Sequence, residues 1–89
     1  MWITGHVIDD QGRPLSAVRI ETSGSGAGRR RAVVSNMRGE YFLQDLQPGE
    51  HTITFARPGF STLERKTDAL TTYVATVNAR LRQVEALGG

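Results

Sequence analysis

The two histidines, His6 and His51, carry the side chains in this sequence that could most directly do chemistry. Beside carboxylates, histidines bind zinc or act as general bases in hydrolases. Each lies in a run that alternates between polar and apolar residues. His6 shares a face with Trp2 and Thr4, whereas His51 shares the apolar face of its run with Ile53. The alternation predicts that the two rings lie on different faces and form neither a catalytic pair nor a metal site.

Nucleophiles and glycine-rich loops give no stronger indication of catalysis. None of the serines occurs in the Gly-x-Ser-x-Gly context of a nucleophile elbow. The stretch GSGAG at residues 24–28 resembles a phosphate-binding loop, but such loops precede a helix and no helical pattern follows here. The turn sequences DDQG and NMRG offer few oxygen ligands, whereas calcium takes about six to eight. The sequence therefore predicts a chain that is not an enzyme and has no cofactor.

Two features are candidates for binding. Arg29, Arg30 and Arg31 follow the glycine-rich stretch and could hold an acidic protein surface, a phosphate group or an anionic lipid, although a solvated loop is the simpler interpretation. Trp2 lies on the polar face of the first run, which we expect to be an edge strand. An aromatic side chain exposed there could anchor a neighbouring domain, or it could fold over the end of the domain.

Bulk properties exclude several classes of protein. The chain of 89 residues has a net charge of +2, which is too small to attract nucleic acid, and no aromatic residues are interleaved with the arginines. It has no cysteine and therefore no disulfide or thiolate metal site. No apolar run approaches the roughly 18 residues of a membrane span. The first residues lack the basic start and apolar block of a signal peptide.

Strand patterns occupy most of the chain. Apolar and β-branched residues alternate with period two in about seven short runs, separated by turn sequences roughly every 8 to 12 residues. The runs cover residues 2–9, 15–23, 32–36, 40–46, 50–57, 60–67 and 70–81. This pattern predicts one all-β domain over residues 1–82, an antiparallel sandwich with a flexible loop at 23–31. Residues 83–89 are expected to form a tail or linker.

Glycine and proline mark the turns between these runs. The expected turn residues are Gly12, Gly39, Pro48, Gly49, Pro58 and Gly59. Proline fixes φ near about −65° and glycine accepts positive φ, so a Pro-Gly pair fills the two central positions of a type II turn. The two Pro-Gly pairs therefore bracket the run at 50–57, and we interpret them as turn signals rather than as a ligand site.

An ordered set of motifs resembles carboxypeptidase regulatory-like domains. The stretches ITGHVIDDQGRPLSAVRI and SNMRGEYFLQDLQPGEHTITFARPGF are similar to the opening and the middle of those domains, and the resemblance extends from about residue 3 to 81. The usual pattern there is Thr-Asp-x-x-Gly-x-Phe/Tyr, then Leu-x-Pro-Gly, an apolar strand and Gly-Tyr/Phe. Asn36 stands where that family usually has aspartate, and asparagine makes the same Asx turn.

The resemblance implies a prealbumin-like, seven-stranded Greek-key β-sandwich of the Ig-like class. It also implies a non-catalytic accessory module of a larger exported bacterial protein, whether secreted, periplasmic or associated with the outer membrane. Its partners would then be neighbouring domains of the parent protein or another protein. The alternative that the sequence leaves open is a module that binds carbohydrate or peptide through an edge strand or its end loops.

Overall fold

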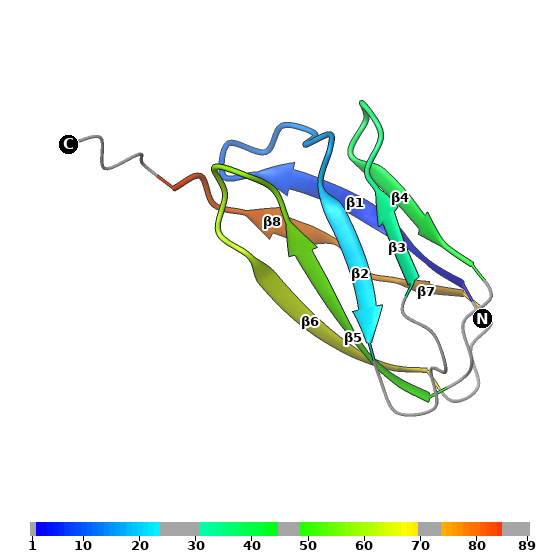
Figure 1. Ribbon diagram of the computed structural model, residues 1–89. Helices are drawn as coiled ribbons and strands as arrows, with labels where there is room; N and C mark the ends of the chain where they lie inside the picture. Colours follow the sequence, from blue (N-terminus) through cyan, green and yellow to red (C-terminus); the bar gives the residue numbers. More distant parts are fainter. Residues whose placement is uncertain (1, 24–30, 45–48, 70–73, 85–89) are drawn as a thin grey trace.

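The computed structural model shows two β-sheets packed face to face, and it describes residues 2–23, 31–44, 49–69 and 74–84 (Figure 1). The strands are β1 (Trp2–Asp9), β2 (Arg19–Ser23), β3 (Arg31–Val34), β4 (Glu40–Leu43), β5 (Gly49–Ala56), β6 (Leu63–Ala69), β7 (Val74–Thr76) and β8 (Ala79–Leu81). One sheet has the order β4-β1-β7, with β8 also pairing with β1, and the other has the order β3-β2-β5-β6. The described residues include no helix, and therefore none that could cross a membrane.

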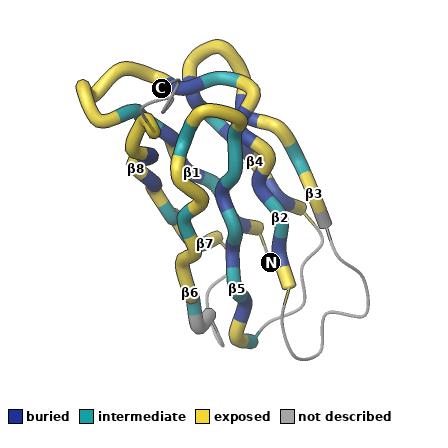
Figure 2. Tube along the Cα trace, turned by 60° about the vertical axis from the view of Figure 1, so that its left-hand side comes forward, coloured by how far each residue is buried: buried dark blue, intermediate teal, exposed yellow. Residues whose placement is uncertain are grey.

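The core lies between the two sheets and is built from the apolar face of each alternating run (Figure 2). The buried apolar residues are Ile3, Val7, Leu15, Val18, Ile20, Tyr41, Leu43, Ile53, Phe55, Ala79 and Leu81. Period-two alternation turns successive side chains to opposite faces of a strand, so a run with every second residue apolar covers one face of a sheet with core. The expected inner faces of residues 2–9 and 50–57 are thus confirmed.

The predicted all-β sandwich is confirmed, with two differences. The chain has eight strands rather than seven, because the run at 70–81, expected to be one strand, contains both β7 and β8. In addition, β7 and β8 pair with β1 in the parallel direction, whereas every other strand pair is antiparallel. Period-two alternation reports which face of a strand is buried but carries no information on the direction of its neighbour.

The break between β7 and β8 has an identifiable cause. The register with β1 is the same on both sides of it, since Thr4 lies opposite Thr76 and Val7 opposite Ala79. Between them, the carbonyl of Val77 leaves the ladder and accepts a hydrogen bond from the Tyr41 hydroxyl. The His6 N–H is satisfied instead by Asn78 Oδ1 at 2.9 Å. A side-chain amide thus replaces a main-chain acceptor and keeps the His6 N–H paired.

Gly5 is the residue that makes this break possible. A β-carbon at Gly5 would lie within the van der Waals radius of the Val77 carbonyl oxygen. The Val77 N–H donates to the Thr4 carbonyl at 2.8 Å, which holds the two segments together at this point. Glycine is therefore required here for close approach of backbone, not for an unusual φ.

Two turns show how side chains and glycines direct the chain. In the turn before β4, Asn36 Oδ1 accepts hydrogen bonds from the N–H groups of Arg38 and Glu40, each at 2.9 Å, as an Asx turn does. In the turn after β5, Gly59 has a φ of 87° and the Phe60 N–H donates to the Arg57 carbonyl at 3.0 Å. This is the geometry of a type II turn.

The other expected turn glycines also have positive φ, with 82° at Gly12, 75° at Gly39 and 138° at Gly49. Pro48, the partner of Gly49, lies outside the described residues.

The close approach at Gly5 predicts a large cost for adding a single methyl group. Gly5→Ala would force the backbone of the β7–β8 junction away from β1, and we expect it to lower the free energy of unfolding by at least about 2 kcal/mol, as overpacking of a tight site does. Urea unfolding measures the loss. Gly12→Ala is the matched control, because a β-carbon at Gly12 meets nothing within 4 Å. Gly12→Ala should lower the free energy of unfolding only by the roughly 1–2 kcal/mol that a non-glycine residue loses in a left-handed conformation.

The Tyr41 phenol predicts a pH dependence of stability. Tyr41 is 3% exposed, and burial raises its pKa above the usual value near 10. The unfolded chain therefore loses this proton first, so the stabilisation is fully present below about pH 10 and declines above it by roughly 1.4 kcal/mol per pH unit. Tyr41→Phe should be about 1–3 kcal/mol less stable at about pH 8, because the Val77 carbonyl loses its donor. The difference between wild type and variant should shrink above about pH 10; a constant difference in urea unfolding would contradict this.

Candidate interaction surface

The outer face of the β4-β1-β7 sheet carries an exposed apolar cluster at one end. Trp2 lies directly opposite Val74 in the register, and Phe42 lies opposite Thr4, so these side chains share the face turned away from the core. Trp2, Phe42 and Val74 are 46%, 40% and 45% exposed. We call these three residues the Trp2 cluster. Exposed large apolar side chains that gather on one face mark a surface for contact with another molecule.

The two aromatic rings of the Trp2 cluster hold each other in place. The ring centroids of Trp2 and Phe42 are 5.2 Å apart and the rings are inclined at 60°, an edge-to-face arrangement. Such pairs contribute about 0.5–1.5 kcal/mol beyond the area they bury. Both rings project from hydrogen-bonded strands rather than from a loop. The cluster is therefore a rigid apolar knob that needs little ordering before it contacts a partner.

The opposite end of the same face is polar. His6 and Glu40 lie directly opposite each other in the register, with Nε2 of His6 3.7 Å from Oε2 of Glu40. Their side chains are 62% and 46% exposed, so the pair is solvated and contributes little to stability. The face thus changes from apolar to polar along the direction of β1, as the core and rim of a protein interface do.

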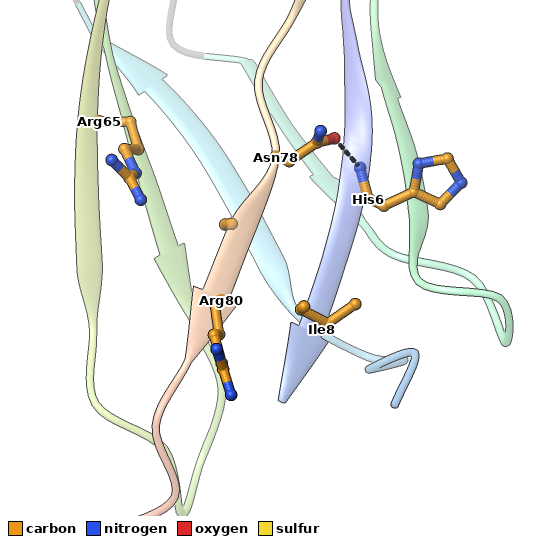
Figure 3. A pocket seen from close by; sticks show the side chains of 6 residues that line it. His6, Ile8, Arg65, Asn78 and Arg80 are labelled. Atoms are coloured by element: carbon orange, nitrogen blue, oxygen red, sulfur yellow. Dashed lines mark hydrogen bonds between the residues drawn. The ribbon is translucent and has the colours of Figure 1, made fainter. Parts of the chain in front are cut away.

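The edge beside this polar end has a cleft of about 350 Å³ (Figure 3). The residues that line it are His6, Ile8, Arg65, Asn78, Ala79 and Arg80. One guanidinium N–H of Arg80 donates to the Asp10 carbonyl at 2.5 Å, and Asn78 accepts from the His6 N–H. Figure 3 shows the His6 imidazole pointing away from both arginines. The cleft therefore combines no base with a nucleophile and offers no hydrolytic arrangement.

The Asp9 carboxylate, at the end of β1, stabilises a turn. Asp9 Oδ1 accepts hydrogen bonds from the N–H groups of Gln11 and Arg13, each at 2.9 Å. The Arg13 N–H is the main cause that holds the pKa of the Asp9 carboxyl below its usual value, and the Arg80 guanidinium adds to it. The N–H groups of its own turn thus favour the ionised form of Asp9, as expected of a carboxylate that stabilises a turn rather than of a general acid.

The structure confirms the prediction that the two histidines lie apart. His6 lies on the outer face of β1, whereas His51 lies in β5 of the other sheet and is 1% exposed, in the core. Within residues 2–23, 31–44, 49–69 and 74–84, no group of three or more histidine, cysteine or acidic residues could hold a metal ion.

Of the binding residues suggested by the sequence, only Trp2 has a described side chain. Arg29 and Arg30 lie outside the described residues, and Arg31 is described only as the first residue of β3. One expectation about Trp2 was wrong. Its strand is not an edge strand, because β1 pairs with β4 on one side and with β7 and β8 on the other. Val74 was missed, since its alternating run does not reveal that it lies beside Trp2.

A family model described as carboxypeptidase regulatory-like domain matches residues 2–82 of the sequence. No curated protein matches the sequence at a significant level.

Solved structures of several kinds have the same fold. The Bacillus anthracis TIE protein is 15% identical with a TM-score of 0.77, and the match covers 93% of this chain and 16% of that one. A streptococcal ancillary pilin is 14% identical with a TM-score of 0.72, and the match covers 94% of this chain and 32% of that one. Chlorocatechol 1,2-dioxygenase from Pseudomonas putida is 14% identical with a TM-score of 0.78, and the match covers 92% of this chain and 59% of that one. This chain therefore spans less than two thirds of each of these proteins, and identities this low show the fold alone.

The exposure of the Trp2 cluster predicts unequal roles for two phenylalanines. Phe42 is 40% exposed and Phe55 is fully buried. Phe42→Ala should cost no more than about 1.5 kcal/mol of unfolding free energy, mainly the contact between its ring and that of Trp2. Phe55→Ala should cost about 3–5 kcal/mol, because it leaves a cavity in the core. Urea unfolding of both variants is the test, and equal losses would show that the Trp2 cluster belongs to the core.

Proposed function

The chain belongs to the carboxypeptidase regulatory-like domain family, and from this premise we propose that it is a non-catalytic module that holds another domain or protein against its Trp2 cluster. The single observation that carries this proposal is the exposed aromatic pair, Trp2 and Phe42, on a rigid sheet face. Aromatic residues are enriched at the centres of protein interfaces because they bury much area at low entropic cost.

The arrangement of polar groups supports a binding role rather than a catalytic one. The polar side chains of His6 and Glu40 stand at the rim of the same face, where a partner would leave them partly solvated. The likeness to a dioxygenase shows the fold alone and lends no activity to this chain. We place the module in a larger protein that works outside the cytoplasm, as the family resemblance implies.

Carbohydrate binding through the same residues is less well supported. A sugar ring stacks one C–H face on an aromatic ring, and two rings form a shared platform for a glycan when they are nearly coplanar. The Trp2 and Phe42 rings are inclined at 60°, so they present an edge and a face rather than one plane. This shape suits an apolar pocket on a protein better than an extended glycan.

Site-specific photo-crosslinking tests the proposal in cells that naturally express the chain. Phe42→p-benzoylphenylalanine should crosslink to one defined domain or protein, and Trp2→Ser in the same chain should abolish the product. Glu64→p-benzoylphenylalanine is the matched control, because Glu64 is exposed on the other sheet. Equal crosslinking from positions 42 and 64, or none from position 42, would refute docking on this face.

A further inference from the structure

The sandwich has two open sides, and each side is bordered by one edge of each sheet. Strands β3 and β4 border one side, and β6 with β7 and β8 borders the other (Figure 1). An edge strand presents unpaired N–H and C=O groups that can pair with another chain, and proteins protect such edges with charged residues. The two open sides of this sandwich differ in that protection.

The β6 edge is protected by charge. Glu64, Arg65 and Lys66 are all exposed on it. Arg65 lies opposite Ile53 in the register, so it is on the face of β6 that turns toward the other sheet. Charged residues along an edge, and inward-pointing charges in particular, oppose pairing with a further strand because pairing would bury them. The β6 edge is therefore unfavourable for pairing with a further strand.

Among the side chains that the structure describes, the β3 edge carries no charged residue. Its residues after the first are Ala32, Val33 and Val34, and Val34 is 62% exposed. The Ser35 N–H donates to the Val18 carbonyl at 2.9 Å. Because hydrogen-bonded positions alternate along an antiparallel strand, the main-chain groups of Val33 turn toward β2. Those of Ala32 and Val34 turn toward the open edge.

A groove lined by both apolar and polar side chains runs beside this edge. The residues that line it are Thr4, Val33, Val34, Asn36, Glu40, Tyr41 and Phe42. On its β4 side, the N–H and C=O of Glu40 are bonded to Asn36. By the same alternation, β4 therefore turns the free main-chain groups of one residue, Phe42, toward the groove, whereas β3 turns those of both Ala32 and Val34 toward it. Phe42 belongs both to the groove and to the Trp2 cluster, so the two surfaces are continuous.

We propose that an extended segment of a partner protein adds to β3 as a further antiparallel strand of the β3-β2-β5-β6 sheet. Its main chain would pair with Ala32 and Val34, and an apolar side chain opposite Val33 would enter the groove. The sequence ends a run of three arginines at Arg31, where β3 begins. The positive charge that the sequence carries at the start of β3 therefore favours an acidic residue toward the matching end of the added strand. This inference rests on the proposed function, since it names the chemistry of the partner.

A blocked hexapeptide, Thr-Thr-Val-Thr-Glu-Thr, is the probe that fits this register. Titrated into the ¹⁵N-labelled chain, it should shift the amide resonances of Ala32 and Val34 more than those of β6. The same peptide with lysine in place of glutamate should bind more weakly at low salt, and the difference should shrink as salt is added.

Proline at the edge supplies the decisive variant. Ala32→Pro removes an outward N–H without breaking a bond to β2, and it should weaken peptide binding at least about tenfold. Lys66→Pro is the matched control, because by the same alternation the Lys66 N–H faces outward on the β6 edge. This variant should bind the peptide as tightly as the wild type does. If Ala32→Pro does not fold, as judged by its NMR spectrum, Val34→Pro removes the other outward N–H of β3.

Each alternative outcome overturns strand addition at β3. These are an absence of shifts at Ala32 and Val34, equal weakening by both proline variants, or a dimer in sedimentation that Ala32→Pro converts to monomer, which would make a second copy the occupant. Crosslinking from position 42 that persists in Ala32→Pro, with no peptide binding by the wild type, would reject strand addition while leaving the proposed function in place.

Discussion

The close approach of the Val77 carbonyl to Gly5 is the contact on which the arrangement of the first sheet depends. It allows β7 and β8 to follow β1 in one register although the ladder between them is interrupted. The Tyr41 hydroxyl and the Asn78 side chain satisfy the groups that the interruption frees. Because a buried polar group without a partner is costly, the Tyr41 hydroxyl matters most where it pairs the partly buried Val77 carbonyl, whereas the bond from His6 to Asn78 lies in an exposed part of the sheet.

This contact also decides which surface the molecule offers. With β7 and β8 on one side and β4 on the other, β1 becomes an interior strand, and its outward side chains gain neighbours from both flanks. Trp2 then stands beside Phe42 and Val74 on a sheet whose strands are fixed by main-chain hydrogen bonds. The same aromatic residue on a true edge strand would have had neighbours on one flank only, and a less rigid setting.

The two open sides of the sandwich differ in how strongly their edge strands oppose pairing with another strand. Charged β6 opposes pairing, whereas on the β3 side a groove joins the Trp2 cluster through Phe42. If a partner adds to β3 as proposed, pairing on one side alone would hold it in a defined orientation without polymerisation through both edges. The solvated pair of His6 and Glu40 lies at the far end of the outer face.

The sequence by itself determined which side of the runs at 2–9 and 50–57 is buried, where several glycine-bearing turns fall, and that the two histidines lie apart. These features follow from period-two alternation and from backbone preferences, which act over a few residues. Only the tertiary structure decided that β1 is interior, that the run at 70–81 contains two strands parallel to it, and that Phe42 packs against Trp2. Choosing a strand's neighbour and its direction depends on contacts between distant residues, and alternation is the same whichever strand lies beside it.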